Sequence, residues 1–202
     1  MSEHLNSEDA EFSLIEPGIY VGSDFYPGAQ TLRGEFDRSM LGENGQYSGL
    51  TPLTYAYYKD AYQFLTAGAE RCFSESLLTN LVEALKQWAT NVLGASHVST
   101  PQVRVYIRGC SRKLFRDNVT APWHFILSLT GNKNSRKSCR IRILRESTPG
   151  KDKLISMNKT VSLVPMFNQL LVHSTNEPYS IEGVETSANP LEGTVLLDGY
   201  MW

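Results

Sequence analysis

Histidine is the residue type most suited to proton transfer or metal binding at neutral pH, and this chain has only four. His4 lies in a polar N-terminal stretch, and His97 lies where a helical pattern gives way to a strand pattern. His173 ends an apolar, strand-like run, and His124 stands within another. Imidazoles at such positions can move protons or ligate a metal, so His124 and His173 are the first candidate catalytic and metal-binding residues.

Three further residues extend this candidate site. Asp117 precedes His124 by seven residues and can contribute a carboxylate. Arg104 and Tyr106 alternate along an apparent strand and therefore share a face. Alternation alone leaves open whether His124 faces the interior.

These residues need a scaffold, and the first half of the chain predicts helices. Residues 74–93 have an apolar stripe at helical spacing, with Ser74 as a possible N-cap and Gly94 as a left-handed stop. Helices are also expected at about 28–40 and 59–72. Turn-forming residues between 42 and 52 favour a loop.

After residue 98 the pattern changes to strands. Alternating or short apolar runs, separated by turn clusters, predict seven or eight strands, with runs at 103–108, 123–129, 139–145, 154–157, 161–164, 170–173 and 194–197. Strands at this spacing are typical of a sandwich or barrel. The expected architecture is one domain over 1–202: a polar tail at 1–15, a helical part at 16–97 and a β core at 98–202.

Composition argues against several classes of partner. Lys plus Arg number 19 and Asp plus Glu number 21, so no positive surplus favours nucleic acid or anionic lipid. No run approaches the roughly 18 apolar residues of a membrane span. Cys72, Cys110 and Cys139 lie far apart, which argues against a disulfide framework. The N-terminus lacks a basic start followed by an apolar run, so a cytoplasmic location is expected.

The order of short motifs resembles a known family. The motifs are Tyr106-Ile107-Arg108-Gly109-Cys110, Leu114-Phe115-Arg116-Asp117-Asn118, Leu127-Ser128-Leu129, His173-Ser174 and the C-terminal run 193–202. Over residues 102–202 this series resembles the iron(II)/2-oxoglutarate-dependent oxygenases, especially the prolyl-hydroxylase-like branch. The resemblance implies a mainly β fold with an N-terminal helical part (α+β), whose core is a double-stranded β-helix, also described as jelly roll or cupin-like.

The resemblance also implies a site with departures from the family. Asp117 stands at the place of the metal-binding carboxylate and His173 at that of the distal histidine, whereas Phe115 occupies the place of the first metal histidine. Thr194 occupies the place of the oxoglutarate-binding arginine, whose bidentate charged pair a hydroxyl does not match. Tyr106 matches a tyrosine that lines the cosubstrate pocket. Its neighbour Arg104 is a candidate replacement for the missing arginine, and His124 for the missing ligand.

Several functions remain open at this point. The first is an oxygenase-fold enzyme with an eroded iron triad, acting on a small or carrier-bound metabolite of specialised metabolism by cyclisation, elimination or isomerisation. The second is a hydroxylase with atypical iron ligation. The third is an inactive pseudoenzyme subunit that binds a protein partner or a second copy through an exposed apolar patch, with Phe115 extending the core. A cupin-like ligand-binding protein is a fourth. The expected cofactor is none, or weakly bound iron(II) with 2-oxoglutarate.

Overall fold

The computed structural model describes residues 12–41, 45, 51–116, 119–131, 139–145, 159–183 and 187–202. Its strands are β1 (Phe12–Glu16), β2 (Ile19–Gly22), β3 (Thr54–Tyr58), β4 (Tyr62–Gly68), β5 (Gln102–Tyr106), β6 (Ser111–Phe115), β7 (Trp123–Ser128), β8 (Ile141–Arg145), β9 (Lys159–Leu163), β10 (Leu170–Ser174), β11 (Tyr179–Ile181) and β12 (Thr194–Met201). The helices are α1 (Ala29–Met40) and α2 (Glu75–Leu93), with short 3₁₀ turns η2 (Ala69–Arg71) and η4 (Pro190–Glu192).

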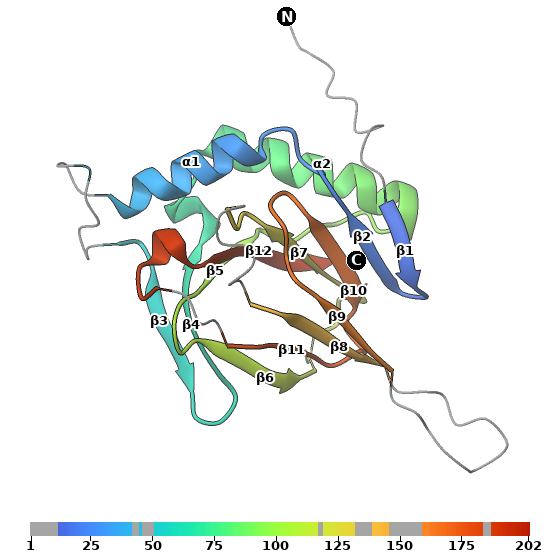
Figure 1. The fold of residues 1–202 in the computed structure, drawn as a ribbon. Coiled ribbons are helices and arrows are strands. Elements are labelled where there is room, and N and C mark those ends of the chain that lie inside the picture. The colour runs from blue at the N-terminus through green and yellow to red at the C-terminus, as the bar shows by residue number, and fades with distance from the viewer. Residues whose placement is uncertain are drawn as a thin grey trace, which may run out of the picture.

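All the strands belong to one curled antiparallel sheet, shown in Figure 1. The order is β1-β2-β10-β7-β12-β5-β4-β6-β11-β8-β9, and β3 pairs only with β4. The pairing of β4 with β6 joins two halves of the sheet, which lie over one another in Figure 1. The chain is therefore mainly β with a jelly-roll, double-stranded β-helix arrangement, and the predicted fold class is confirmed.

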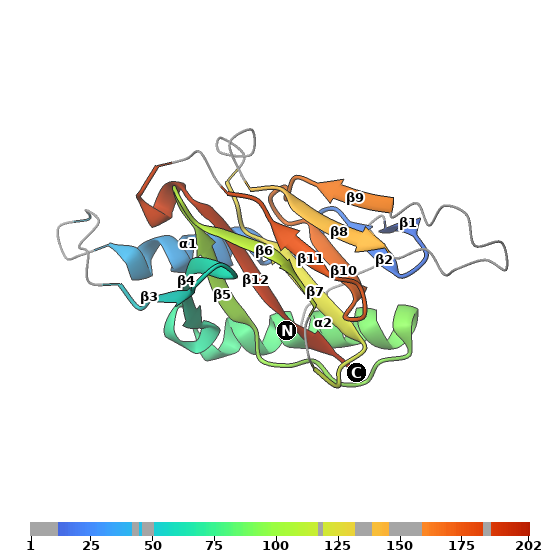
Figure 2. The same cartoon turned by 90° about the horizontal axis from the view of Figure 1, so that it is seen from below.

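Both helices cover the outer face of the larger half of the sheet, as Figures 1 and 2 show. In α1 the side chains of Leu32, Phe36 and Met40 recur every four residues and are fully buried against this face. In α2 the apolar stripe is buried in the same layer, and Gly94 ends the helix at φ +69°. The predictions of helices at 28–40 and 74–93 are confirmed.

Alternation along the strands divides the interior into two layers. Outward-facing residues such as Val103, Phe125 and Leu197 pack under the helices. Inward-facing residues such as Tyr106, Ile126 and Leu196 pack between the two halves of the sheet. The second layer is the interior of the jelly roll, and a polar side chain on its strands is positioned there only when its register matches that face.

The helical interpretation of the N-terminal part needs correction. The predicted helix at 59–72 is wrong, because β4 and the turn η2 occupy that segment. Tyrosine, phenylalanine and threonine between 62 and 66 favour a strand, and pairing with β3 and β5 stabilises it. Strand β1 begins inside the expected polar tail, and four of the strands in the described ranges precede residue 98. The predicted strand at 154–157 and most of the predicted loop at 42–52 lie outside the described residues.

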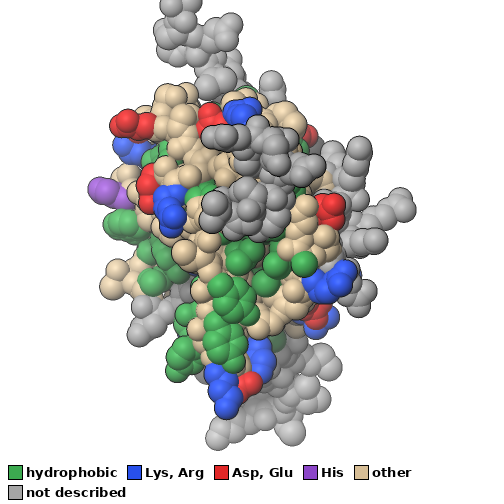
Figure 3. All heavy atoms as spheres, turned by 90° about the vertical axis from the view of Figure 1, so that its left-hand side faces the viewer, with side chains coloured by type: hydrophobic (Ala, Val, Ile, Leu, Met, Phe, Trp, Pro, Cys, Tyr) green, Lys and Arg blue, Asp and Glu red, His purple; other side chains and the backbone are tan. Residues whose placement is uncertain are grey.

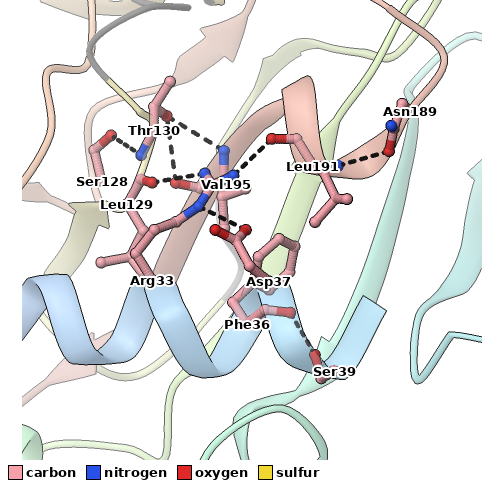
Figure 4. Close-up of polar contacts among 10 residues, drawn as sticks. All are labelled: Arg33, Phe36, Asp37, Ser39, Ser128, Leu129, Thr130, Asn189, Leu191 and Val195. Atoms are coloured by element: carbon pink, nitrogen blue, oxygen red, sulfur yellow. Dashed lines mark hydrogen bonds and ion pairs between the residues drawn. The ribbon is translucent and has the colours of Figure 1, made fainter. Parts of the chain in front are cut away.

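One buried arginine ties α1 to the strands that carry the candidate site, as Figure 4 shows. The Arg33 guanidinium donates from Nη1 to the Leu129 carbonyl oxygen at 2.9 Å and from Nη2 to the Leu191 carbonyl oxygen at 2.6 Å. Its Nε pairs with Asp37, one helical turn on, at 2.9 Å. Leu129 follows β7 and Leu191 precedes β12, so Arg33 holds the ends of two neighbouring strands against α1.

Candidate active site

Four adjacent strands place ionisable side chains in the jelly-roll interior. His173 comes from β10, His124 from β7, Asp198 from β12 and Arg104 from β5. His124 lies directly opposite His173 in the β7–β10 register, and it faces inward. Both histidines are fully buried, and His124 shares a strand face with Ile126, whose side chain packs in the jelly-roll interior.

The side chains form a continuous run of polar contacts. His124 Nδ1 lies 3.0 Å from His173 Nε2, and His124 Nε2 lies 3.3 Å from Asp198 Oδ2. Arg104 Nη1 forms an ion pair with the same carboxylate oxygen at 3.0 Å. At the other end, His173 Nδ1 lies 2.9 Å from the carbonyl oxygen of Ser174. We call Arg104, Asp198, His124 and His173 the interior network.

The partners of each nitrogen assign the protons within this network. The carbonyl oxygen of Ser174 can only accept, so His173 Nδ1 carries the proton that it donates. Neutral His173 then accepts at Nε2 from His124 Nδ1. An ionised Asp198 can only accept, so His124 Nε2 also donates.

The electrostatics of the network agree with this assignment. Burial, reinforced by His124, lowers the pKa of His173 to about 3, so its imidazole is neutral at pH 7. Burial alone raises the pKa of Asp198, but the Arg104 charge and the His124 hydrogen bond outweigh it, and the net pKa is below the ordinary value. Burial disfavours the charged form of Arg104, yet the carboxylate of Asp198 holds its pKa above the ordinary value. Asp198 therefore stays ionised and Arg104 stays charged.

Aromatic rings enclose the network. The ring of Tyr179, from β11, lies 5.0 Å from both imidazoles, and the ring of Tyr200 lies 5.2 Å from that of His124. Tyr106 is fully buried, and burial raises the pKa of its hydroxyl despite the nearby Arg104 charge. Among the described residues, neither the Tyr106 hydroxyl nor Asp198 Oδ1 has a hydrogen-bond partner. Buried polar atoms of this kind indicate a place for a ligand or an ordered water.

The remaining predicted site residues have different positions. Asp117 lies outside the described residues. Phe115 lies opposite Tyr179 in the β6–β11 register, but its side chain is 43% exposed, so the expectation that it extends the core is wrong. Its ring faces solvent on one side and the Arg112 guanidinium on the other, 4.8 Å away. Thr194 is buried, and its hydroxyl accepts a hydrogen bond from the backbone N–H of Cys139 at 3.0 Å.

Sequence reasoning missed Asp198, which links the two halves of the network. The signal was a single carboxylate inside the otherwise apolar run of β12, an expensive residue to bury unless it is paired. Its partners lie 74 residues away at His124 and on β5 at Arg104, so spacing along the chain did not reveal the pairing.

The described donors do not fit an iron centre. His124 uses one ring nitrogen for His173 and the opposite one for Asp198, so the two imidazoles and the carboxylate do not converge on one point. No group of three or more His, Cys, Asp or Glu residues in the described ranges is placed to hold a metal ion. The candidate cosubstrate groups are also committed, since Arg104 pairs with Asp198 and Thr194 bonds Cys139.

Comparison with known proteins identifies the fold. No family model matches the chain, and no curated protein sequence matches it. Its structure is similar to a prolyl-4-hydroxylase from Pseudomonas putida, at a TM-score of 0.63 and 14% identity over 91% of each chain. It is also similar to two proteins of nogalamycin biosynthesis. One is the alpha-ketoglutarate-dependent carbocyclase SnoK, at a TM-score of 0.62 and 11% identity over 91% of this chain and 79% of that one. The other is the alpha-ketoglutarate-dependent epimerase SnoN, at a TM-score of 0.64 and 10% identity over 91% of this chain and 78% of that one.

The chain therefore has the fold of the iron(II)/2-oxoglutarate-dependent oxygenases, as the sequence motifs implied. These structural neighbours differ in chemistry, so the fold alone assigns no reaction to this chain. Neither of the helices described here is long and apolar enough to cross a membrane.

Proposed function

We propose that this protein is an enzyme that uses the oxygenase fold for acid–base chemistry without iron. The substrate is a small or carrier-bound molecule of specialised metabolism, and the reaction is a cyclisation, elimination or isomerisation. The observation that carries the proposal is the unbroken run from Arg104 through Asp198 and His124 to His173, buried in the jelly-roll interior. Ionisable groups whose environments drive their pKa values apart are suited to such work.

Two atoms of this interior have no hydrogen-bond partner among the described residues, and we assign them to contact with the substrate. Asp198 is ionised, and its Oδ1 can accept a proton or a hydrogen bond, since only Oδ2 is used by Arg104 and His124 among the described residues. The Tyr106 hydroxyl keeps its proton because burial raises its pKa, so it can donate to a substrate oxygen. An isomerisation takes one proton from the substrate and returns one, so it consumes no oxidant.

The other members of the network support these two groups. The charge of Arg104 and the hydrogen bond from His124 hold Asp198 ionised and fix the orientation of its carboxylate. His173 holds the His124 ring from the other side, because it is itself fixed by the Ser174 carbonyl. A hydroxy-carbonyl compound matches these two atoms when the hydrogen-bearing carbon beside the carbonyl lies toward Asp198 Oδ1, which takes the C–H proton and returns it, and the carbonyl oxygen lies toward the Tyr106 hydroxyl.

Proton exchange with solvent tests this proposal without knowledge of the natural substrate. Chelator-treated protein is incubated in D₂O with a panel of hydroxy-carbonyl compounds, and deuterium incorporation beside the carbonyl is followed by proton NMR. We expect metal-independent exchange that falls about 100-fold or more in Asp198→Asn and Tyr106→Phe. Tyr55→Phe is the matched control, since Tyr55 lies on the exposed strand β3. Turnover that requires both iron(II) and 2-oxoglutarate contradicts the proposal and supports the atypical hydroxylase.

A second candidate is an inactive subunit that binds a partner protein or a second copy of the chain. One observation favours it: β3 exposes three tyrosines, Tyr55, Tyr57 and Tyr58, with 60%, 59% and 66% of their surfaces accessible. Exposed apolar groups gathered in one place often mark interaction sites. This candidate predicts no proton exchange with any compound of the panel and association of the purified protein in sedimentation.

A further inference from the structure

The tip of the β3–β4 hairpin forms a small pocket outside the interior network. It has a volume of about 210 Å³, and its lining includes Tyr57, Tyr58 and Tyr62. The hairpin lies at the lower left of Figure 1, and Figure 3 looks onto that side of the molecule, where hydrophobic side chains gather. Pockets for drug-sized ligands are about 300–1,000 Å³, so this one suits a single compact part of a ligand.

A series of rings connects this pocket to the interior. Tyr58 stacks on Tyr62 with ring centroids 6.1 Å apart, and Tyr62 stacks on Phe64 at 5.2 Å, both with an interplanar angle of 28°. Phe64 then contacts Tyr106 at 5.6 Å. The Arg104 guanidinium lies over the Phe64 ring, 5.2 Å from its centroid. The series therefore runs from an exposed tyrosine to two residues of the candidate active site.

Strand register explains why these rings share one face. Tyr58 is paired with Tyr62 across the β3–β4 hairpin, and Phe64 follows Tyr62 by two residues. Residues two apart on a strand point to the same side. That side is the inner face of the sheet, because Tyr62, Phe64 and Tyr106 pack in the jelly-roll interior. Tyr55 differs from Tyr58 in parity and does not line the pocket.

The chemistry of the pocket selects the kind of ligand. Its cation, Lys113, already pairs with Asp60 at 3.4 Å, and both side chains are well exposed to water. The pair is therefore screened and gives little preference for an ion. The stacked rings provide flat apolar surfaces, and aromatic rings bind such surfaces in offset-stacked or edge-on arrangements. A flat ring gains both burial and stacking here.

We propose that the tip of the β3–β4 hairpin is a subsite for a planar aromatic ring, and that this ring belongs to the substrate of the interior site. The ring stacks on Tyr58 and Tyr62, and the remainder of the molecule extends along Phe64 toward Tyr106 and Asp198. The claim that this ring belongs to the substrate of the interior site rests on the proposed function, whereas ring binding at the hairpin does not.

Ring binding is measured with 2-naphthol as the probe and decahydro-2-naphthol, its saturated counterpart, as the comparison. Saturation-transfer NMR titrations give the dissociation constant of each compound for the wild type, Tyr58→Leu, Tyr62→Leu and the control Tyr55→Leu. We expect 2-naphthol to bind the wild type more tightly than its saturated counterpart. Tyr58→Leu and Tyr62→Leu should each weaken 2-naphthol binding about threefold to tenfold, because an aromatic pair contributes that much beyond burial. Tyr55→Leu should leave it unchanged.

Any of three results overturns the proposal. The first is a wild type that binds 2-naphthol no more tightly than its saturated counterpart, and the second is a Tyr58→Leu variant that binds 2-naphthol as tightly as the wild type. The third is a Tyr55→Leu variant that loses as much 2-naphthol affinity as Tyr58→Leu. A change in sedimentation of Tyr58→Leu without a change in 2-naphthol binding also overturns it and assigns the tyrosines to a protein contact. The link to the interior is tested separately, by competition of the 2-naphthol signal with an aromatic hydroxy-ketone. If the wild-type protein binds 2-naphthol but catalyses no proton exchange, the result contradicts the proposed function and leaves the ring subsite standing.

Discussion

Replacing Asp198 by asparagine isolates the charge that holds the interior network together. The amide keeps the shape of the carboxyl group but removes its negative charge. In the wild type this charge lies 3.0 Å from Arg104 and 3.3 Å from His124, and the Asp198 side chain is almost fully buried. The variant therefore leaves a buried guanidinium without its anion, which costs more than the loss of one neutral hydrogen bond.

The expected loss follows from the geometry. Two unit charges at 3.0 Å attract with about 5.5 kcal/mol at an effective dielectric constant of about 20. The cost of burying both charges offsets part of this attraction, and removal of one partner from a buried pair typically costs about 3–5 kcal/mol. For a chain of 202 residues that corresponds to a fall in unfolding temperature of about 6–20 °C.

Urea unfolding at pH 7 measures this loss. The control is Glu182→Gln, which removes an ion pair with Arg142 at 2.7 Å whose side chains are 47% and 40% exposed, so the expected change is about 0–1 kcal/mol. The pKa of Asp198 is below its ordinary value, so its stabilisation is present at pH 7 and is lost as pH falls through the lowered value. A loss in Asp198→Asn no larger than in the control refutes the argument. The argument is also refuted if the stability losses of Asp198→Asn and Arg104→Met simply add in the double variant, because residues that interact must show coupling.

Three further predictions concern the fold and the site. Folded His173 has a pKa near 3, below the ordinary value of about 6.5, so the unfolded chain binds more protons between these values. The free energy of unfolding should then fall with decreasing pH by up to about 1.4 kcal/mol per unit, and urea titrations of His173→Gln should lack this slope. Arg33→Met should lower the free energy of unfolding by about 2–4 kcal/mol, because the Leu129 and Leu191 carbonyls lose a charged donor. The control Lys86→Met, at an exposed position, should lower it by about 0.5 kcal/mol or less. Anaerobic iron(II) should leave the thermal midpoint of the chelator-treated protein unchanged, whereas a rise shows a native-state metal site.

Much of the architecture follows from local patterns. Helices α1 and α2 were predicted within a residue or two, because their apolar positions recur at helical spacing and Gly94 supplies the left-handed stop. Strands β5, β7, β8, β10 and β12 were predicted from alternation or short apolar runs. Arg142 of β8 and Arg140 just before it pair with Glu182 at the surface.

The wrong predictions concern segments whose structure depends on strand partners far along the chain. The β4 aromatics Tyr62 and Phe64 stand two residues apart, which suits one face of a strand, and pairing with β3 and β5 stabilises that strand. The same pairing places Tyr58 and Tyr62 on the inner face, so the ring series to the interior had no sequence signal.

For the candidate site, the sequence by itself determined the residue types and the alternation that puts Arg104 with Tyr106 and His124 with Ile126. It left open which face of each strand is buried. The tertiary structure decided that β12 lies between β7 and β5, and this insertion brings Asp198 between His124 and Arg104. The physical reason is that a charged group is tolerated in an apolar interior only beside its partners. Those partners come from strands whose neighbours are set by the order of the whole sheet, which spacing along one strand does not encode.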